Sequence, residues 1–441
     1  MKEKPNVILI VLDTCRSDAI YPLEANERMP FLREFSKGCN VFPNSISPAA
    51  WTIPAHASIF TGLYPSRHGV IERVNGEIPN YSELYEKYEG VTLAESLKGQ
   101  GYSTIGFSQN LLIAPDTSFS RGFDEFFYTH NMGQDTYFRM LENYNKLLSN
   151  YGSSINKLLP KIINPGKSRE FISLYRQVKR DTKWLQNTDL RDKGGNLTIN
   201  RIKSYEFRPP FFLFLNLMEM HDPHDRISLN FGWSDSFFKN SRPSPEQVRS
   251  VKDSYFNASK TVDKLLSDLI EFLSGKGFLE NSILLITSDH GQALMEHDYF
   301  FGHGNFLYDE IIKVPLLIRL PNGQKIEVNN GYQSTTRIKP FIENFIQGNP
   351  VYDSFTEEFA FSECFGTLDK DVEKYRDHPK YKEVMKRIDI PRTAVYYKDK
   401  KLVMDMESKK VEEFKSFSEK IEPQESSQIL EEMKGFISIF N

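Results

Sequence analysis

Four short apolar runs constrain the fold of this chain more than any other feature of the sequence. They lie at residues 7–12, 210–217, 282–287 and 314–320, and each is nearly continuous in apolar, often β-branched, side chains. A strand with one face in solvent alternates apolar and polar residues, whereas a strand that is buried on both faces does not. Helical patterns alternate with these runs. We therefore predict an α/β fold with a large, mostly parallel sheet flanked by helices.

Spacing of apolar residues also indicates how the rest of the chain is organised. It predicts helices at 29–37, 91–98 and 245–275. The stretch 130–205 is polar, in places basic, and without strong strand patterns, so we interpret it as a helical insertion or lid over the sheet edge. We expect a main α/β domain over 1–345 and a smaller α+β subdomain over 346–441. This subdomain should contain a small antiparallel sheet of two or three strands from residue 393 and a terminal helix at 426–440.

Composition and charge exclude several classes of partner. The 441 residues are 39% hydrophobic and 26% charged, with a net charge of −4, which does not favour a nucleic acid or an anionic membrane. The apolar run at 7–12 is too short to span a membrane and lacks a cleavage site. Three widely spaced cysteines, Cys15, Cys39 and Cys364, do not form a disulfide framework. We expect a soluble, cytoplasmic protein with no transmembrane segment, and the sequence does not indicate its oligomeric state.

Metal-binding side chain types gather where three of the predicted strands end. These residues are Asp13 after the first run, Glu219, His221, Asp222 and His224 after FFLFLNLM, and Asp289 and His290 after ILLITS. Taken singly, each has a structural interpretation as a turn former or a hydrogen-bonded histidine. The carboxyl ends of parallel strands meet at one edge of a sheet, where open α/β folds bind ligands. Carboxylates and imidazoles that converge there predict a divalent metal site for Mn, Zn, Ca or Mg, with a second site as an open alternative.

The stretch SPAAWTIPAHASIFTG, residues 47–62, contains a polar Thr52 at the start of a predicted helix. Pro54 suits the first turn and Gly62 suits a helix stop. One interpretation makes Thr52 an N-cap, since threonine caps helices well. The other makes it a nucleophile held at the positive end of the helix.

Seven motifs in order resemble the sulfatase branch of the alkaline phosphatase superfamily. They are NVILIVLDTCRSD, WTIPAHASIFTGLYPSRHGV, GYSTIGFSQN, RGFDEFF, PFFLFLNLMEMHDPH, ITSDHG and GHGNFLYDEIIKVPLLIRLP, spread over residues 5–321, with the stretch 130–195 unmatched. The resemblance implies a sulfatase-like fold and makes 1–345 the catalytic domain. It also implies that Asp13, Asp289 and His290 are metal ligands. Thr52 falls at the position of the family nucleophile, so it is expected both to cap the helix and to coordinate the metal as the attacking group.

The same resemblance assigns roles to the remaining candidates. His221 matches a family residue that contacts the substrate anion, with His224 nearby, and Asn110 is expected to donate to the same anion. His56 stands in place of the family arginine and is expected to assist in substrate binding. His303 has two open roles, as a ligand of a second metal with a partner from the Glu219–His224 cluster, or as a donor to the leaving oxygen.

Departures from the family pattern bear on the chemistry. Sulfatases carry Cys or Ser within C/S-x-P-x-R and oxidise it to formylglycine, whereas this chain has TIPAH at 52–56. Oxidation of a threonine would give a ketone, so Thr52 cannot yield the formylglycine aldehyde. The sulfatase lysine after GY-x-T is replaced by Ser108, Gln109 and Asn110. Thr14 stands where many sulfatases have a further metal-binding aspartate, which fits a transition-metal site at least as well as a calcium site.

These features together favour phosphoester chemistry. Superfamily relatives with an unmodified threonine include nucleotide phosphodiesterases and phosphoglycerol or phosphoethanolamine transferases. We predict a metal-dependent hydrolase that acts through Thr52 on a phosphodiester or a phosphonate monoester, either a small molecule or linked to a glycan or lipid. Open alternatives are a sulfatase that uses Thr52 directly and a transferase that moves a phospho-alcohol to a glycan. A catalytically silent binding protein would show damaged metal ligands, which are all present here.

Overall fold

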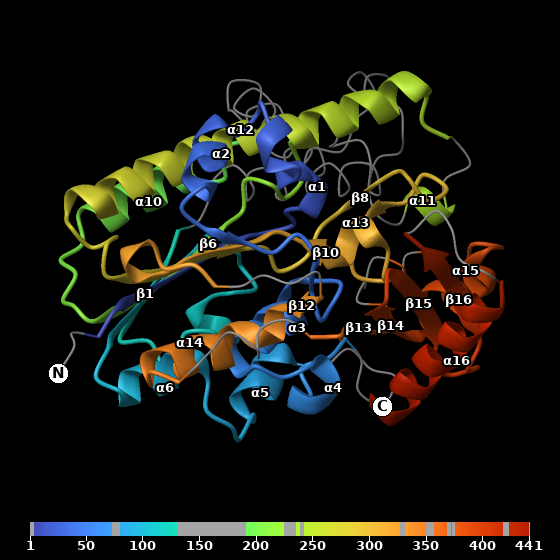
Figure 1. Cartoon of the computed structure of the whole chain (residues 1–441). Helices are drawn as coiled ribbons and strands as arrows, with labels where there is room; N and C mark the ends of the chain where they lie inside the picture. Colours follow the sequence, from blue (N-terminus) through green and yellow to red (C-terminus); the bar gives the residue numbers. More distant parts are fainter. Residues whose placement is uncertain are drawn as a thin grey trace, which may run out of the picture.

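A seven-stranded sheet forms the centre of the computed structural model (Figure 1). The structure describes residues 4–72, 80–129, 191–224, 235–238, 242–326, 331–349, 357–367, 372, 375–417 and 423–440. In spatial order, the strands of the sheet are β2 (Asn40–Val41), β11 (Leu316–Arg319), β7 (Ser282–Thr287), β1 (Asn6–Leu12), β6 (Phe211–Leu217), β4 (Ser103–Ser108) and β5 (Glu125–Tyr128). The predicted α/β class is confirmed, and the four apolar runs are β1, β6, β7 and β11.

Five neighbouring strands of this sheet, from β7 to β5, run parallel. Strand β11 is antiparallel to β7, and the edge strand β2 is antiparallel to β11. A parallel neighbour requires a long crossover, usually a helix. The segment 288–315 contains no such helix, and Leu316 at the start of β11 pairs with Thr287 at the end of β7. The whole segment therefore begins and ends at the carboxyl edge of the sheet.

Both faces of the sheet are covered, because successive side chains of a strand point to opposite faces. Ile8, Ile10 and Leu12 of β1 belong to a core on the side of α12 (Pro245–Gly275), where Figure 1 also shows α2 (Pro30–Ser36) and α10 (Gly195–Lys203). Val7, Leu9 and Val11 belong to a second core on the side of α3 (Thr52–Thr61), α6 (Leu93–Gly99) and α14 (Ile338–Ile346). All six side chains are fully buried, as the continuous apolar pattern predicts.

Helix α12 coincides with the helix predicted at 245–275. Its start is fixed by a capping box, in which the Ser244 hydroxyl accepts from the Gln247 N–H and the Gln247 side chain accepts from the Ser244 N–H. The lid expected at 130–205 lies outside the described residues up to residue 190. Its described end contains α10, which packs against α12.

The C-terminal part forms its own antiparallel sheet, in the order β13 (Phe359–Phe365), β14 (Pro391–Tyr397), β15 (Lys400–Asp405) and β16 (Val411–Ser416). Helices α15 (Tyr381–Ile388) and α16 (Pro423–Phe440) lie beside it in Figure 1. The strands expected after residue 393 are present, and β13 adds one that the sequence analysis missed. The domain boundary after residue 345 stays a prediction.

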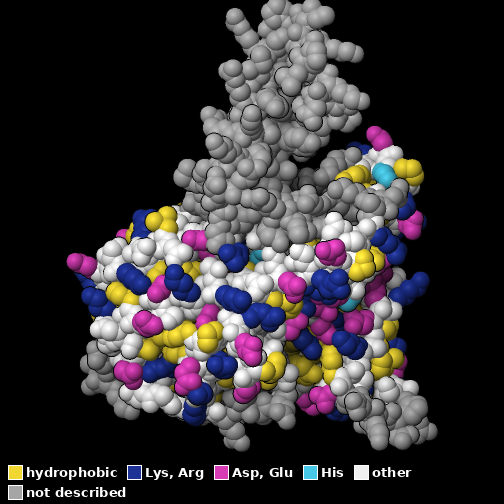
Figure 2. All heavy atoms as spheres, turned by 90° about the horizontal axis from the view of Figure 1, so that it is seen from above, with side chains coloured by type: hydrophobic (Ala, Val, Ile, Leu, Met, Phe, Trp, Pro, Cys, Tyr) yellow, Lys and Arg dark blue, Asp and Glu magenta, His cyan; other side chains and the backbone are white. Residues whose placement is uncertain are grey.

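Several smaller expectations can be compared with the described residues. Cys15, Cys39 and Cys364 are all free and buried, so no disulfide joins them. None of the helices in the described part of the chain combines the length and the apolar character needed to span a membrane. On the face seen in Figure 2, the described Lys and Arg side chains are interspersed with Asp and Glu, as the small net charge suggests.

A buried ion pair connects the main sheet layer to the C-terminal sheet. Asp309 begins the short helix α13 (Asp309–Ile312), and its carboxylate lies 3.3 Å from Nζ of Lys401 and 2.5 Å from Nζ of Lys415. It also accepts a hydrogen bond from the Tyr396 hydroxyl. Burial alone would raise the pKa of Asp309, but the surrounding lysines outweigh it and hold the pKa well below its usual range.

Replacing Asp309 with asparagine should lower the free energy of unfolding by about 2 kcal/mol, because the fully buried Lys401 would lose one charged partner and keep the other, Glu413 at 3.0 Å. Urea unfolding followed by tryptophan fluorescence measures the loss. Glu280→Gln is the matched control, since the Glu280 side chain is 69% exposed in its pair with Arg319 and should cost less than about 0.5 kcal/mol. Equal losses in the two variants would contradict the prediction.

Candidate active site

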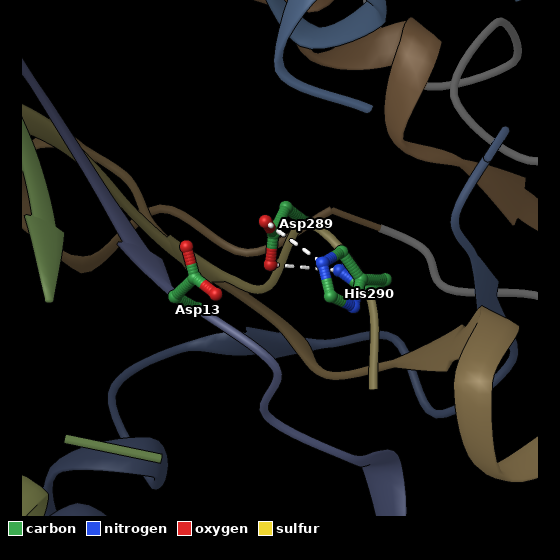
Figure 3. A group of neighbouring side chains, drawn as sticks. All are labelled: Asp13, Asp289 and His290. Carbon is green, nitrogen blue, oxygen red and sulfur yellow. Dashed lines mark hydrogen bonds and ion pairs between the residues drawn. The ribbon is translucent and has the colours of Figure 1, made fainter. Parts of the chain in front are cut away.

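Three ligand-type side chains meet at the carboxyl edge of the central sheet. Asp13 directly follows β1, and Asp289 and His290 follow the neighbouring strand β7. Figure 3 shows the three side chains pointing toward one another. Each offers one ligand atom, these atoms all lie within 4.8 Å of one another, and all three residues are fully buried. The structure thus brings together three of the four predicted metal ligands from two loops.

Asp13 uses only one of its two carboxylate oxygens in hydrogen bonds. Oδ2 accepts from Nδ2 of Asn110 at 2.7 Å and from Nδ2 of Asn216 at 3.4 Å. Oδ1 is buried and has no hydrogen-bond partner among the described residues. One oxygen is therefore left for a ligand that is not a protein hydrogen-bond donor.

Asp289 shows the same division between its oxygens. Oδ1 accepts from the backbone N–H of Thr14 at 3.1 Å and from that of His290 at 2.8 Å, whereas Oδ2 has no hydrogen-bond partner among the described residues. Thr14 has a φ of 56°, a left-handed conformation that is unfavourable for a β-branched residue. In this conformation the N–H of Thr14 donates to Oδ1 of Asp289. Strained backbone of this kind is common at functional sites.

The electrostatics of the group fit a divalent cation. Burial raises the pKa of both carboxyl groups, and the charge of Asp289 raises that of Asp13 further. Burial lowers the pKa of His290 to about 4, so its imidazole is neutral. Nδ1 of His290 donates to the carbonyl of Gly291 at 2.8 Å, which leaves the lone pair on Nε2. Two unsatisfied carboxylate oxygens and one neutral imidazole nitrogen are a donor set for a divalent metal ion.

Thr52 lies next to this group, but it is not the helix cap. Trp51 is the N-cap of α3, with extended backbone (φ −161°, ψ 170°), and Thr52 is the first helical residue. The N-cap prediction is therefore wrong, and its reason is that the chain turns into the helix one residue earlier. The Thr52 hydroxyl instead lies 3.2 Å from Nε2 of His290. Pro54 in the first turn and the stop at Gly62 (φ 75°) are confirmed.

His56 lies one turn further along α3 and is fully buried. Its Nδ1 lies 2.9 Å from the Thr52 carbonyl and donates to it, and its Nε2 accepts from Nδ2 of Asn216 at 3.3 Å. Burial lowers the pKa of His56 to about 3. Because the protein itself occupies both ring nitrogens, the substrate contact predicted for His56 finds no free ring nitrogen in this structure. These contacts hold the backbone of Thr52.

His221 and His303 are brought to the site, as the sequence predicts. The His303 ring centroid lies 4.4 Å from that of His290 and 5.5 Å from that of His221. Burial lowers the pKa of His221, but Asp222 and Asp13 outweigh it and raise the pKa overall. Burial and the neighbouring His290 lower the pKa of His303. The two rings therefore differ in their tendency to carry charge.

Two members of the predicted cluster face other parts of the protein. Nε2 of His224 donates to the carbonyl of Met220 at 2.8 Å, and the ring stands edge-on to Tyr255 of α12. Glu219 accepts from the backbone N–H groups at the start of α10, those of Lys193 and Gly195. His224 thus packs against Tyr255 of α12. Both of these N–H groups donate to Oε1 of Glu219, whereas its Oε2 is buried without a hydrogen-bond partner among the described residues. The predicted roles of His224 at the substrate and of this cluster at a second metal stay predictions.

Sequence reasoning missed two polar residues of the site, Asn216 and Gln292. Asn216 joins Asp13 to His56, and its signal is a polar residue inside the otherwise apolar run FFLFLNLM. Gln292 joins His303 to Asp222, and its signal is only its place directly after Asp-His-Gly. Both are buried amides, and their partners come from other strands and loops, so their role becomes visible only in three dimensions.

Comparisons with known proteins agree on one family. A family model described as Sulfatase matches residues 5–343. Similar curated proteins include an ulvan-active sulfatase of Formosa agariphila, 26% identical over 335 residues and 73% of this chain, and arylsulfatase K of Canis lupus familiaris, 22% identical over 355 residues and 72% of this chain. Both are longer proteins, of which the chain covers 57% and 58%.

Solved structures show the same fold at low sequence identity. A phosphonate monoester hydrolase from Silicibacter pomeroyi superposes with a TM-score of 0.62 at 14% identity, over 99% of this chain and 95% of that one. A 2-O GAG sulfatase superposes with a TM-score of 0.65 at 15% identity, over 99% and 92% of the two chains.

The donor set predicts that a divalent cation stabilises the protein. At a free concentration 100 times its Kd, the right cation should add about 2.7 kcal/mol to the free energy of unfolding. The pKa values of Asp13 and Asp289 in the folded protein lie above the ordinary value of 3.8. The metal-free protein therefore loses stability as the pH rises from this ordinary value to the raised values. The thermal midpoint is measured with each of Mn²⁺, Zn²⁺, Ca²⁺ and Mg²⁺ and with a chelator. The rise in midpoint that the right cation causes, relative to chelator, should therefore be larger at about pH 8 than at about pH 5.

Asp289→Asn should remove this cation-dependent shift. The matched control is Asp263→Asn, because Asp263 is a buried aspartate that caps α2 through the N–H groups of Phe31 and Leu32 and lies outside the group. This control should keep the shift even if its midpoint is lower. A cation response that survives Asp289→Asn would rule out the assigned ligand set.

Proposed function

The chain belongs to the sulfatase family, and from this premise we propose that it is a metal-dependent ester hydrolase with Thr52 as its nucleophile. The observation that carries the proposal is the position of the Thr52 hydroxyl, 3.2 Å from Nε2 of His290. The same Nε2 lies 3.4 Å from Oδ2 of Asp289, an oxygen without a hydrogen-bond partner among the described residues. Thr52 is 3% exposed and is the first residue of helix α3. A lone capping threonine would not be expected in such surroundings.

A divalent cation held by Asp13, Asp289 and His290 would lower the pKa of the Thr52 hydroxyl and offset negative charge on the ester. The protein contributes the rest through fixed geometry. The N-terminus of α3 adds positive potential at Thr52, and the hydrogen bond from His56 to the Thr52 carbonyl fixes the backbone there. Attack by Oγ1 forms an ester on Thr52 and expels the alcohol, and water then releases the acid from Thr52.

Other residues are proposed to bind and orient the ester. His221 is the proposed contact of the substrate anion, supported by its place beside His303 and by the raised pKa that favours its charged form. Asn110 uses an N–H of its side-chain amide to hold Asp13, and its second amide N–H is the proposed donor to the anion. His303 keeps its two alternative roles, at the leaving oxygen or at a second cation.

A phosphodiester or a phosphonate monoester is the proposed substrate class. Thr52 cannot form the aldehyde that sulfatases with Cys or Ser use, and a covalent threonine ester of phosphorus can be resolved by water. The likeness in fold to a phosphonate monoester hydrolase agrees with this class. A sulfate ester is the second candidate, favoured by the curated relatives, which are named as sulfatases.

Thr52→Ala should reduce turnover by about 10³-fold or more, because the nucleophile would be lost. The assay uses cation-loaded protein and four nitrophenyl substrates. They are a phosphodiester, a phenylphosphonate ester, a phosphate monoester and a sulfate ester. Thr61→Ala is the matched control, since Thr61 is a buried threonine of the same helix whose hydroxyl donates to the Ala57 carbonyl. It should retain turnover within a few-fold.

The pattern across the esters separates the two substrate classes. Dominant turnover of the phosphodiester or phenylphosphonate that depends on Thr52 supports the first candidate. Dominant turnover of the sulfate that depends on Thr52 supports the second. Turnover that is equal in the wild type, Thr52→Ala and Thr61→Ala would refute Thr52 as the nucleophile.

A further inference from the structure

Gln292 is held rigidly through its backbone at the edge of the site. Its N–H donates to the carbonyl of Glu310 at 3.0 Å, and its carbonyl accepts from Nη1 of Arg16 at 3.2 Å. The backbone of the preceding residue, Gly291, lies so close to Glu310 that a Cβ on Gly291 would be 2.2 Å from the Glu310 carbonyl oxygen. The side chain of Gln292 therefore starts from a fixed point, and the residue is only 1% exposed.

The side-chain amide of Gln292 bridges two loops. Nε2 lies 3.3 Å from Oδ1 of Asp222, and Oε1 lies 2.8 Å from Nδ1 of His303. A carboxylate oxygen can only accept a hydrogen bond, so the NH₂ group of the amide must face Asp222. The carbonyl oxygen of the amide must then face His303. This orientation follows from the chemistry of the partners alone.

The orientation of the amide decides the tautomer of His303. An amide oxygen accepts, so Nδ1 of His303 must carry the proton, and in the neutral ring Nε2 carries the lone pair. His221 and His290 follow the same rule, because their Nδ1 atoms lie 2.7 and 2.8 Å from the carbonyl oxygens of Asp222 and Gly291. All three neighbouring imidazoles thus have a protonated Nδ1 and, when neutral, an unprotonated Nε2.

We propose that Gln292 is a positioning residue, which fixes the tautomer and ring orientation of His303 and ties His303 through Asp222 to His221. The consequence for catalysis rests on the proposed function. When His303 is neutral, its unprotonated Nε2 can then take up a proton or bind a cation. Donation to a leaving oxygen from Nε2 would first require a second proton on the ring.

The ring tautomer can be read without any substrate. Protein labelled with ¹⁵N-histidine gives long-range ¹H–¹⁵N spectra in which protonated and unprotonated ring nitrogens have different shifts, and a His303→Gln variant assigns the His303 signals. At fixed neutral pH, the wild type should show a protonated Nδ1 for His303. Gln292→Leu should convert His303 to a mixture of tautomers, since the acceptor is lost. Because this readout is independent of turnover, it stands even if the proposed hydrolase activity fails.

Two further variants sharpen the test. Gln292→Glu keeps an acceptor oxygen for Nδ1 of His303 but loses the donor to Asp222, so it should keep the tautomer of His303. Gln333→Leu is the matched control, because Gln333 is an equally buried glutamine on β12 (Gln333–Ser334) whose side chain donates to the Gly331 carbonyl. It should leave the His303 signals unchanged.

Activity supplies a second readout. Gln292→Leu should lower kcat by about 10- to 100-fold with little change in KM, the usual range for a group that orients another. Gln292→Glu should recover part of that loss, and Gln333→Leu should show none. A protonated Nδ1 of His303 that persists in Gln292→Leu would overturn the proposal. If the leucine variant does not fold, loss of the protonated Nδ1 in Gln292→Glu would overturn it instead.

Discussion

Two buried carboxylates held close together, those of Asp13 and Asp289, set the constraint on which the rest of the site depends. Burying a charged group without full pairing is costly, and here the two groups also repel each other. The protein compensates on one oxygen of each, with amides from Asn110 and Asn216 and backbone N–H groups from Thr14 and His290. The opposite oxygens have no hydrogen-bond donor among the described residues, so the repulsion is offset either by a proton, as the raised pKa values indicate, or by a bound cation.

The strand β11, which is antiparallel to its neighbour β7, explains how so many groups reach this place. Because segment 288–315 leaves and rejoins the sheet at its carboxyl edge, it delivers Asp289, Gln292 and His303 to the same side as Asp13. The same segment ends in α13, where Asp309 is paired with lysines of the C-terminal sheet. The C-terminal sheet is thereby linked to the segment that carries Asp289, His290, Gln292 and His303.

Much of the fold and the centre of the site can be read from local sequence. Runs that are apolar on both faces identify β1, β6 and β7, and helical spacing identifies α12 with its limits. Asp13, Asp289 and His290 stand directly after such strands, and a position next to a strand end is a local property. Thr52 lies beside His290, and its role in the site stays a prediction. Its predicted cap role is wrong, because the backbone conformation of Trp51 decides where the helix begins.

The sequence by itself determined the α/β class, the two-sided burial of the central strands and the metal-type donors at their ends, since each depends on residue type and short-range periodicity. Only the tertiary structure decided what each polar side chain contacts. His56 donates to the Thr52 carbonyl and His224 donates to the Met220 carbonyl. Gln292 donates to Asp222, which lies 70 residues away in sequence. Such hydrogen bonds have strict geometry but no fixed sequence separation, so no local pattern encodes them.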